Sequence, residues 1–256
     1  MADTGDDRRV AVVTGASSGL GRAVAHRLAR DGYRVALLAR DAGDLAGLAE
    51  DIGRSGGSAL SRPVDLAGAA PAQAAVAEVV ARWGRVDVLV NAAGTDVPGT
   101  VEATTVEDWD RVLAVNLRAP FVLSKAVFPH MRRAGGGTIV NVSSVAGLRG
   151  WASAAAYCSS KFALTGFTQA LAAEGRPHGI RACVLYPGAM ATSWGAWEPA
   201  ERRTTDPADP ADPQRTGREA LGPEQVADLV AWIVAAPGNL VLPQVTVTPL
   251  DEQGWP

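Results

Sequence analysis

The strongest constraint on the fold lies near the N-terminus, where a short apolar run leads into a cluster of glycines. Residues 10–13 read Val-Ala-Val-Val, which is typical of a buried parallel strand. A glycine-rich turn at residues 14–21, a helical pattern to about Gly32 and a second apolar run at residues 34–39 follow. This order makes a βαβ unit, so the pattern predicts a parallel sheet.

The glycines of this turn have separate predicted roles. Gly15 permits a tight turn, and Gly19 and Gly21 allow the backbone to approach a pyrophosphate at the N-terminus of the following helix. A glycine-rich loop without any ligand is the alternative interpretation.

Strands and helices alternate along the rest of the chain. We expect further strands at residues 58–63, 86–90, 138–142, 180–185 and 245–248, and helices at 41–55, 70–83, 105–133, 157–174 and 223–235. The alternation predicts an α/β fold: one Rossmann-type, doubly wound parallel sheet of about seven strands, with helices on both faces, in a single domain over residues 1–256. Pro120 should kink its helix or remove one hydrogen bond.

Two segments are expected to lie outside this regular pattern. Residues 1–9 are polar and are interpreted as a flexible tail. Residues 189–222 contain prolines at threefold spacing, which exclude a regular helix there. We interpret this second segment as an inserted substrate loop or lid, or as a plain surface linker.

Composition excludes several function classes. The net charge of −3 argues against a nucleic-acid surface, and the two cysteines fit a reducing cytoplasm. No signal peptide and no uninterrupted apolar run of membrane-spanning length is evident, and the three scattered histidines suggest no metal site. We therefore expect a cytoplasmic protein with no nucleic-acid, membrane or metal partner.

The candidate chemistry lies between Ser144 and Lys161. Tyr157 and Lys161 are four residues apart, so on a helix they share one face. A nearby lysine cation lowers the pKa of a tyrosine, and a hydroxyl at Ser144, at the end of a buried strand, can hold a carbonyl oxygen. Taken alone, the same residues fit an ordinary amphipathic helix and a turn serine.

The motifs taken together resemble the short-chain dehydrogenase/reductase family over about residues 8–250. Those that carry the resemblance occur in the family's order: Thr14-Gly15-x-x-x-Gly19-x-Gly21, Asn91-x-Ala93-Gly94, Asn116, Ser144, Tyr157-x-x-x-Lys161 and Pro187-Gly188. One departure is Ala92, where the family commonly has a second asparagine. The first asparagine remains, so its contact at the strand end is expected to survive.

The resemblance implies catalytic roles and an assembly. Tyr157 would be the general acid in carbonyl reduction and the general base in alcohol oxidation. Lys161 would lower the pKa of Tyr157 and bind the nicotinamide ribose, and Ser144 would orient the substrate oxygen. Asn116 would hold a proton-relaying water, or cap the kink beside Pro120, or both. Family members commonly pair the helices of Asn116 and Tyr157, so we expect a homotetramer, a dimer of dimers.

The cofactor is predicted to be NADP(H). Ala39 ends the second strand where an acidic residue would favour NAD, and the guanidinium of Arg40 suits a 2′-phosphate. A solvated Arg40, or ribose binding by Asp41, would leave NAD open. By resemblance, Asp65 and Leu66 flank the adenine and Thr192 meets the nicotinamide carboxamide. The complete predicted cofactor set is Gly15, Ser17, Ser18, Gly19, Leu20, Gly21, Arg40, Asp65, Leu66, Asn91, Gly94, Tyr157, Lys161, Pro187, Gly188 and Thr192.

The substrate side is less defined by the sequence. Candidate pocket residues are Asp96, Ala146, Trp151, Ala154, Gly188 and Trp194. Aromatic walls suit an apolar or ring-bearing substrate, although each tryptophan also fits ordinary packing under a loop. Cys158 is expected to be buried and directed elsewhere on its helix.

These features predict an NADP(H)-dependent oxidoreductase that acts on a ketone or secondary alcohol, as a biosynthetic ketoreductase or a broad-range reductase. Two other classes remain open. One is a non-catalytic nucleotide sensor or scaffold, and the other is a family member that performs a non-redox dehydration.

Overall fold

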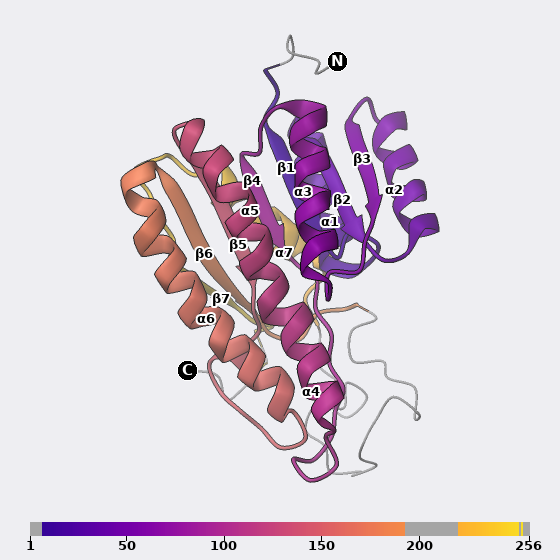
Figure 1. Ribbon diagram of the computed structural model, residues 1–256, viewed down its shortest axis with the longest axis vertical. Helices are drawn as coiled ribbons and strands as arrows, with labels where there is room; N and C mark the ends of the chain where they lie inside the picture. The colour runs from indigo at the N-terminus through magenta and orange to yellow at the C-terminus, as the bar shows by residue number, and fades with distance from the viewer. Residues whose placement is uncertain (1–6, 193–219, 251, 253–256) are drawn as a thin grey trace.

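A single parallel sheet organises the molecule (Figure 1). The computed structural model describes residues 7–192, 220–250 and 252. The strands are β1 (Val10–Thr14), β2 (Arg34–Ala39), β3 (Ser58–Pro63), β4 (Val88–Asn91), β5 (Gly137–Val142), β6 (Ile180–Pro187) and β7 (Gln244–Val247). They pair in the order β3-β2-β1-β4-β5-β6-β7, and every pairing is parallel. The predicted seven-stranded α/β fold is confirmed.

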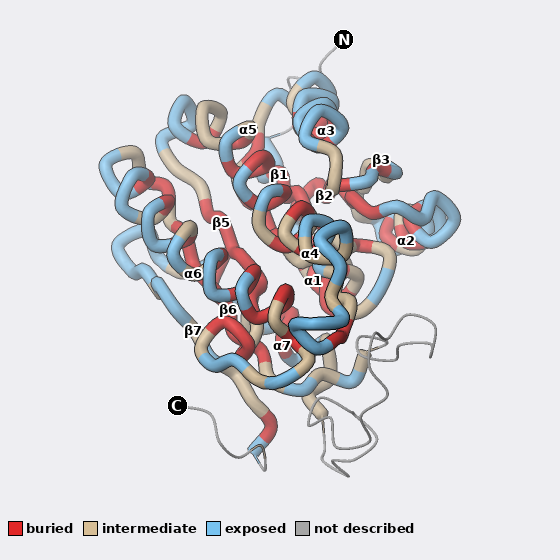
Figure 2. Tube along the Cα trace, turned by 60° about the horizontal axis from the view of Figure 1, so that its bottom comes forward, coloured by how far each residue is buried: buried red, intermediate tan, exposed pale blue. Residues whose placement is uncertain are grey.

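Helices cover both faces of this sheet. The principal helices are α1 (Gly19–Arg30), α2 (Ala42–Arg54), α3 (Ala69–Trp83), α4 (Val106–Leu113), α5 (Ala119–Arg133), α6 (Ala155–Gly175) and α7 (Pro223–Ala235). Helices α1, α2 and α7 pack on one face of the sheet, and α3, α5 and α6 pack on the other. The sheet is therefore buried on both sides, and the tube view in Figure 2 shows its strands as buried throughout the centre.

Side chains along β1 point alternately to the two faces of the sheet, and each face has its own hydrophobic core. Ala11 and Val13 pack toward α1 and α7, whereas Val10 and Val12 pack toward α3 and α5. All four are fully buried. Burying a valine side chain contributes about 1.5–3 kcal/mol, so a central strand with no polar face is stable only between two helical layers.

The long helical stretch around Pro120 is interrupted. A π-helical turn, η1 (Ala114–Arg118), separates α4 from α5, and the Ala119 N–H donates to the carbonyl of Ala114, five residues earlier. Proline has no N–H, so the regular i to i−4 ladder cannot continue through Pro120. The predicted loss of regular hydrogen bonding is confirmed, and Asn116 lies inside the irregular turn.

The continuous helical stretch Val106–Arg133 also meets the length and composition expected of a membrane span, with a mean hydropathy of 1.3 over its most apolar part. It is the one such helix in the part of the chain that the structure describes. Half of that part is buried inside the fold, and core helices commonly pass this test, so it is weak evidence for a membrane.

The carboxyl ends of the strands meet at one edge, where loops from β1, β4, β5 and β6 come together. In such sheets, ligands bind at the point where the strand order reverses, here between β1 and β4. The predicted lid reaches the same edge. Its two ends are paired, since the Ala191 N–H donates to the Leu221 carbonyl at 2.8 Å and the Leu221 N–H donates to Ala189 at 3.0 Å. The lid's central part, including Trp194, lies outside the described residues.

Candidate active site

The first turns of α6 bring Tyr157 and Lys161 to one face of that helix. The Lys161 Nζ lies 5.5 Å from the centroid of the Tyr157 ring. Both residues are buried, with exposed fractions of 8% for Tyr157 and 4% for Lys161. Lys161 Nζ donates to the carbonyl of Val142 at 2.9 Å, so the ammonium group is directed at the end of β5.

Ser144 joins this pair from the end of β5. It begins a short 3₁₀ turn, η2 (Val145–Gly147), and its Oγ accepts a hydrogen bond from the Ala146 N–H at 3.1 Å. A side-chain hydrogen bond also links Ser144 with Tyr157. The structure therefore brings together the three residues that the sequence placed in one reaction centre.

Gly147 allows the turn to pack against α6 at this point. A Cβ on Gly147 would lie 2.5 Å from the Ser143 Oγ and 3.0 Å from the Lys161 carbonyl oxygen. Ser143 Oγ itself donates to that carbonyl at 3.2 Å. The absence of a side chain at Gly147 thus lets the Ser144 turn pack closely against α6, a role that the sequence did not reveal.

The pKa of Tyr157 beside Lys161 differs from the lowered value that the sequence led us to expect. Burial raises the pKa of Tyr157 well above its usual value; the Ser144 hydrogen bond opposes this effect, and the charge of Asp96 adds to it. Burial also lowers the pKa of Lys161 to about 8, against a raising effect of Asp96. The expected lowering of the Tyr157 pKa is therefore wrong, because desolvation is the largest effect on this buried phenol and raises its pKa.

Asn116 links the loop after β4 to α6. Its Oδ1 accepts from the Thr95 N–H at 2.8 Å, and its Nδ2 donates to the Thr95 carbonyl at 2.8 Å and to the Ser160 Oγ at 3.0 Å. Ser160 Oγ in turn donates to the Tyr157 carbonyl at 2.7 Å. The side-chain amide of Asn116 is thus hydrogen-bonded to protein atoms. A proton-relaying water held by Asn116 would therefore bind to the backbone carbonyl of this residue.

The glycine-rich turn forms a close-packed cradle after β1. Gly15 and Gly19 have φ angles of +66° and +49°, in the left-handed region that favours glycine. A Cβ on Gly21 would lie 2.2 Å from the Gly15 carbonyl oxygen. Ser18 precedes α1 without capping it through its side chain, so the first N–H groups of α1 can meet an anion.

A buried amide adds to this cradle at the end of β4. Asn91 Nδ2 donates to Asn141 Oδ1 at 2.8 Å, and Asn141 Nδ2 donates to the Thr168 Oγ1 at 2.8 Å. The Asn91 Oδ1 is buried and has no hydrogen-bond partner among the described residues. The unpaired Asn91 Oδ1 and the glycine-rich turn together fit a bound nucleotide whose hydrogen-bond donors would satisfy that oxygen. The strand-end contact of Asn91 survives despite Ala92.

The other predicted cofactor residues lie along the same edge. Arg40 is exposed directly after β2, Asp65 and Leu66 follow β3, and Pro187 ends β6. The Gly188 N–H donates to the Val247 carbonyl at 2.8 Å. The Thr192 methyl group would lie 3.3 Å from a Cβ on Gly19, so the loop after β6 reaches the cradle. The remaining members, Ser17, Leu20 and Gly94, lie in the loops after β1 and β4 or at the start of α1.

The predicted substrate side is an apolar cluster beside Tyr157. Ala146, Ala154, Tyr157 and Cys158 form it, with Trp151 packed against them. The expectation that Cys158 is buried is confirmed, and Cys158 lies in the same apolar cluster as Tyr157. The backbone N–H of Trp151 donates to the Cys158 thiol, and burial raises the pKa of this thiol.

Sequence reasoning also missed residues that hold the loops in place. Thr14 Oγ1 accepts from the N–H groups of Ala92 and Ala93 at 3.0 and 2.9 Å. A hydroxyl directly before the first glycine is a sequence signal that could have revealed this contact. Glu252 Oε2 accepts from the Ala189 N–H at 3.0 Å, and nothing local in the sequence predicts that contact. Within residues 7–192, 220–250 and 252, no group of three potential metal ligands comes together.

The motifs and their geometry agree with a comparison against known proteins. Residues 9–202 match the family described as short chain dehydrogenase. The chain belongs to the short-chain dehydrogenase family.

Several members of the short-chain dehydrogenase family are similar to the chain along most of its length. A D-threitol dehydrogenase from Mycolicibacterium smegmatis is 40% identical over 194 residues, 75% of each chain. The short-chain reductase protein NovJ from Streptomyces niveus is 40% identical over 88% of this chain and 86% of its own. A crystal structure of a metagenomic short-chain oxidoreductase in complex with NADP superimposes with a TM-score of 0.80 and 35% identity, covering 95% of this chain and 98% of that one.

Proposed function

We propose that this protein is an NADP(H)-dependent oxidoreductase that interconverts a ketone and a secondary alcohol, with Tyr157 as general acid and base. One observation carries the proposal: Tyr157 and Lys161 are buried together, half-buried Ser144 is hydrogen-bonded to Tyr157, and all three lie at the sheet edge that carries the glycine-rich turn. Family membership supports oxidoreductase chemistry.

The roles follow from where each group lies. The bound nicotinamide would supply or accept the hydride. The Ser144 hydroxyl would hold the substrate oxygen, and Tyr157, hydrogen-bonded to Ser144, would donate a proton to that oxygen in reduction and remove it in oxidation. Lys161 would supply a positive charge near the phenol and contact the ribose. Its lowered pKa makes it a group that can also pass a proton toward solvent.

NADP(H) is the cofactor that the loop after β2 favours. Asp41 could have bound a ribose, but its Oδ1 accepts from the Asp44 N–H at 2.8 Å and caps α2. Arg40 is exposed and makes no ion pair with the residues in the described ranges. Its guanidinium can therefore give paired, charge-assisted hydrogen bonds to a 2′-phosphate. The NADP complex of the metagenomic relative supports this assignment.

The Arg40 assignment is tested by comparing cofactor affinities. Arg40→Ala should weaken NADPH binding about 10- to 100-fold, because hydrogen bonds to charged groups contribute roughly 1.5–3 kcal/mol. NADH binding should change little. Arg82→Ala, an exposed arginine in α3, is the matched control. Equal loss for both cofactors, or tighter NADH binding by the unchanged protein, would contradict NADP(H) preference.

The catalytic assignment is tested with Tyr157→Phe. We expect turnover to fall by at least about 10²-fold, in line with the loss of a positioned acid or base, while cofactor binding is retained. Tyr33→Phe is the control, because its buried hydroxyl has no hydrogen-bond partner among the described residues. The measurements are kcat with a panel of ketones and NADPH affinity by fluorescence. Undiminished turnover in Tyr157→Phe would contradict the role of Tyr157 as general acid and base.

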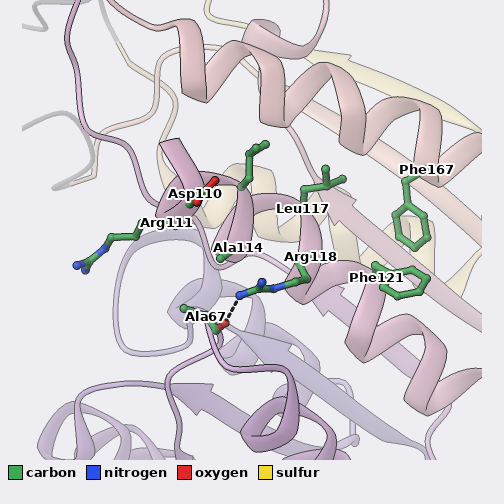
Figure 3. Close-up of a pocket in the computed structure, with 9 residues that line it drawn as sticks. Ala67, Asp110, Arg111, Ala114, Leu117, Arg118, Phe121 and Phe167 are labelled. Atoms are coloured by element: carbon green, nitrogen blue, oxygen red, sulfur yellow. Dashed lines mark hydrogen bonds between the residues drawn. The ribbon is translucent and has the colours of Figure 1, made fainter. Parts of the chain in front are cut away.

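We also propose that the protein assembles through α5 and α6, as a homotetramer. A groove of about 710 Å³ is lined by residues of α4, η1, α5 and α6, with Ala67. Figure 3 shows its lining residues, among them Leu117, Phe121 and Phe167. Phe121 in α5 and Phe162 in α6 are 47% and 46% exposed. Exposed apolar side chains of this size on neighbouring helices support pairing with a second copy.

A further inference from the structure

A chain of buried side-chain hydrogen bonds runs from α6 to the end of β4. Its members are Thr168 in α6, Asn141 in β5 and Asn91 in β4, and all three side chains are buried. Asn141 Nδ2 donates to Thr168 Oγ1 at 2.8 Å, and Asn91 Nδ2 donates to Asn141 Oδ1 at 2.8 Å. Asn91 and Asn141 are partners in the parallel pairing of β4 with β5. Three elements that are distant in the sequence therefore share one row of polar groups inside the core.

The hydroxyl of Thr168 fixes the direction of every hydrogen bond in this chain. A threonine hydroxyl has a single proton, and Thr168 donates it to the Leu164 carbonyl at 2.7 Å. Thr168 Oγ1 can then only accept, so Asn141 turns its Nδ2 toward α6 and its Oδ1 toward β4. Asn91 in turn presents its Nδ2 to Asn141, which leaves the Asn91 Oδ1 at the free end of the chain.

The free end of the chain is a buried acceptor where a sheet of this kind binds ligands. Asn91 is 3% exposed, and its Oδ1 accepts no hydrogen bond from the part of the chain that the structure describes. Asn91 ends β4, which lies next to β1 where the strand order reverses. Ala93 lies against the glycine-rich turn, 3.0 Å from where a Cβ on Gly15 would be. Since a buried acceptor without a donor is costly, this oxygen fits a donor that a bound nucleotide brings.

We propose that Thr168 and Asn141 are positioning residues for the cofactor, because they hold the Asn91 amide with its acceptor, and not its donor, available to the nucleotide. The donor on the nucleotide is a hydroxyl of the adenine ribose or the amino group of the adenine. The proposal rests on the cofactor binding of the proposed function. Thr168 follows Lys161 by seven residues, about two turns along one face of α6. The helix that carries Tyr157 and Lys161 therefore also sets the orientation of Asn91.

The experiment measures the affinity of the full-length protein for NADPH by fluorescence titration. Thr168→Val keeps the shape of the side chain but removes the hydroxyl, so the amides of Asn141 and Asn91 can turn over. We expect the Kd for NADPH to rise about 3- to 10-fold. Thr168→Ala should show the same loss, and Thr168→Ser, which keeps the hydroxyl, should restore the wild-type affinity. Ser124→Ala is the matched control, because it removes a buried hydroxyl of α5 that has no hydrogen-bond partner within residues 7–192, 220–250 and 252.

A double variant separates positioning from a purely structural effect. Asn91→Ala removes the acceptor and should weaken NADPH binding, and adding Thr168→Val should then cause no further loss. A loss that persists in the Asn91→Ala background would overturn the proposal, because Thr168 would then act through the fold and not through Asn91. An unchanged Kd in Thr168→Val would also overturn it, as expected if a buried water satisfies the Asn91 Oδ1. Both of these results leave NADPH binding by the wild-type protein, and the proposed function, intact.

A cofactor analogue identifies the donor on the nucleotide. The analogue of NADPH in which hypoxanthine replaces adenine lacks the amino group. Equal weakening of NADPH and of this analogue by Thr168→Val would support the role with a ribose hydroxyl as donor, whereas weakening of NADPH alone would support it with the adenine amino group. Binding of neither NADPH nor NADH by the wild-type protein would count against the proposed function itself, and the inference would fall with it.

Discussion

At the scale of single residues, the site is dominated by the cost of burying polar groups. Lys161 is 4% exposed, and it donates a hydrogen bond to the Val142 carbonyl, which is neutral. Burial lowers the pKa of Lys161 to about 8 from a usual value of about 10.4. The charged form of this side chain is therefore less stable in the fold than in the unfolded chain, which is a stability cost at neutral pH.

The resulting pH dependence has a definite sign. Between pH 8 and 10 the unfolded chain keeps the Lys161 proton while the folded protein loses it, so the Lys161 contribution to the unfolding free energy should rise, by up to about 3 kcal/mol. Lys161→Met, which cannot titrate, should lack this rise. The measurement is urea unfolding of both proteins at pH 7, 8, 9 and 10.

Two controls make the Lys161 prediction specific. Lys125→Met removes the only other lysine of the chain, which is exposed, and should leave the pH profile intact. The raised pKa of Tyr157 acts in the opposite sense, since stability is lost where unfolded tyrosine ionises near pH 10 and the buried one does not. Tyr157 is present in both wild type and Lys161→Met, so its effect is common to the two profiles. Parallel profiles for the two proteins would show that Lys161 keeps its ordinary pKa.

At the scale of elements, one hydroxyl joins the ends of two strands. Thr14 ends β1, and its Oγ1 accepts the N–H groups of Ala92 and Ala93, which follow β4. The two loops that bound the proposed cofactor site thus share a hydrogen-bonded junction. A Cβ on Gly15 would lie 3.0 Å from Ala93, which shows how closely the loops approach.

Thr14→Val should separate these loops without changing the size of the side chain. Two N–H groups lose their acceptor, so we expect a stability loss of about 1–3 kcal/mol and weaker NADPH binding. Thr14→Ser keeps the hydroxyl and should restore both properties. Chemical denaturation and cofactor titration measure the effects, and a Thr14→Val protein with unchanged cofactor affinity would show that the junction does not position the cradle.

At the scale of the whole molecule, both faces of the sheet are covered, yet α5 and α6 each carry an exposed phenylalanine, Phe121 and Phe162. Phe121 also packs edge-on against Phe167, with ring centroids 5.9 Å apart, so this face is already ordered in one chain. An ordered apolar face loses little side-chain entropy when a second copy covers it.

The assembly prediction is tested by charging this face. Phe121→Asp with Phe162→Asp should reduce the mass measured by light scattering from a tetramer to a smaller species, because a charge cannot be buried unpaired in an apolar interface. Val101→Asp, at an 81% exposed position in a loop, is the control. A monomeric wild-type protein, or a tetramer in the double variant, would refute assembly through these helices.

The sequence alone determined the fold and the reaction centre to a large extent. The βαβ pattern of residues 10–39 and the later alternation predicted the seven-stranded sheet, because buried parallel strands and their crossover helices leave a strong local pattern. The motif at Ser144, Tyr157 and Lys161 pointed to one site, and the structure brings these residues together. The sequence predicted only that Pro120 would disturb its helix, because proline lacks the backbone N–H that donates one helical hydrogen bond. It did not predict the π-helical turn that replaces the regular hydrogen bonds before Pro120.

Only the tertiary structure decided the environment of these groups. The raised pKa of Tyr157, the place of Cys158 in the apolar cluster and the chain of hydrogen bonds that ends at Asn91 depend on elements distant in the chain. The same is true of Thr14 and Glu252, whose partners lie 78 and 63 residues away. Local periodicity encodes which element forms, whereas burial and charge at a site are sums over everything that packs around it.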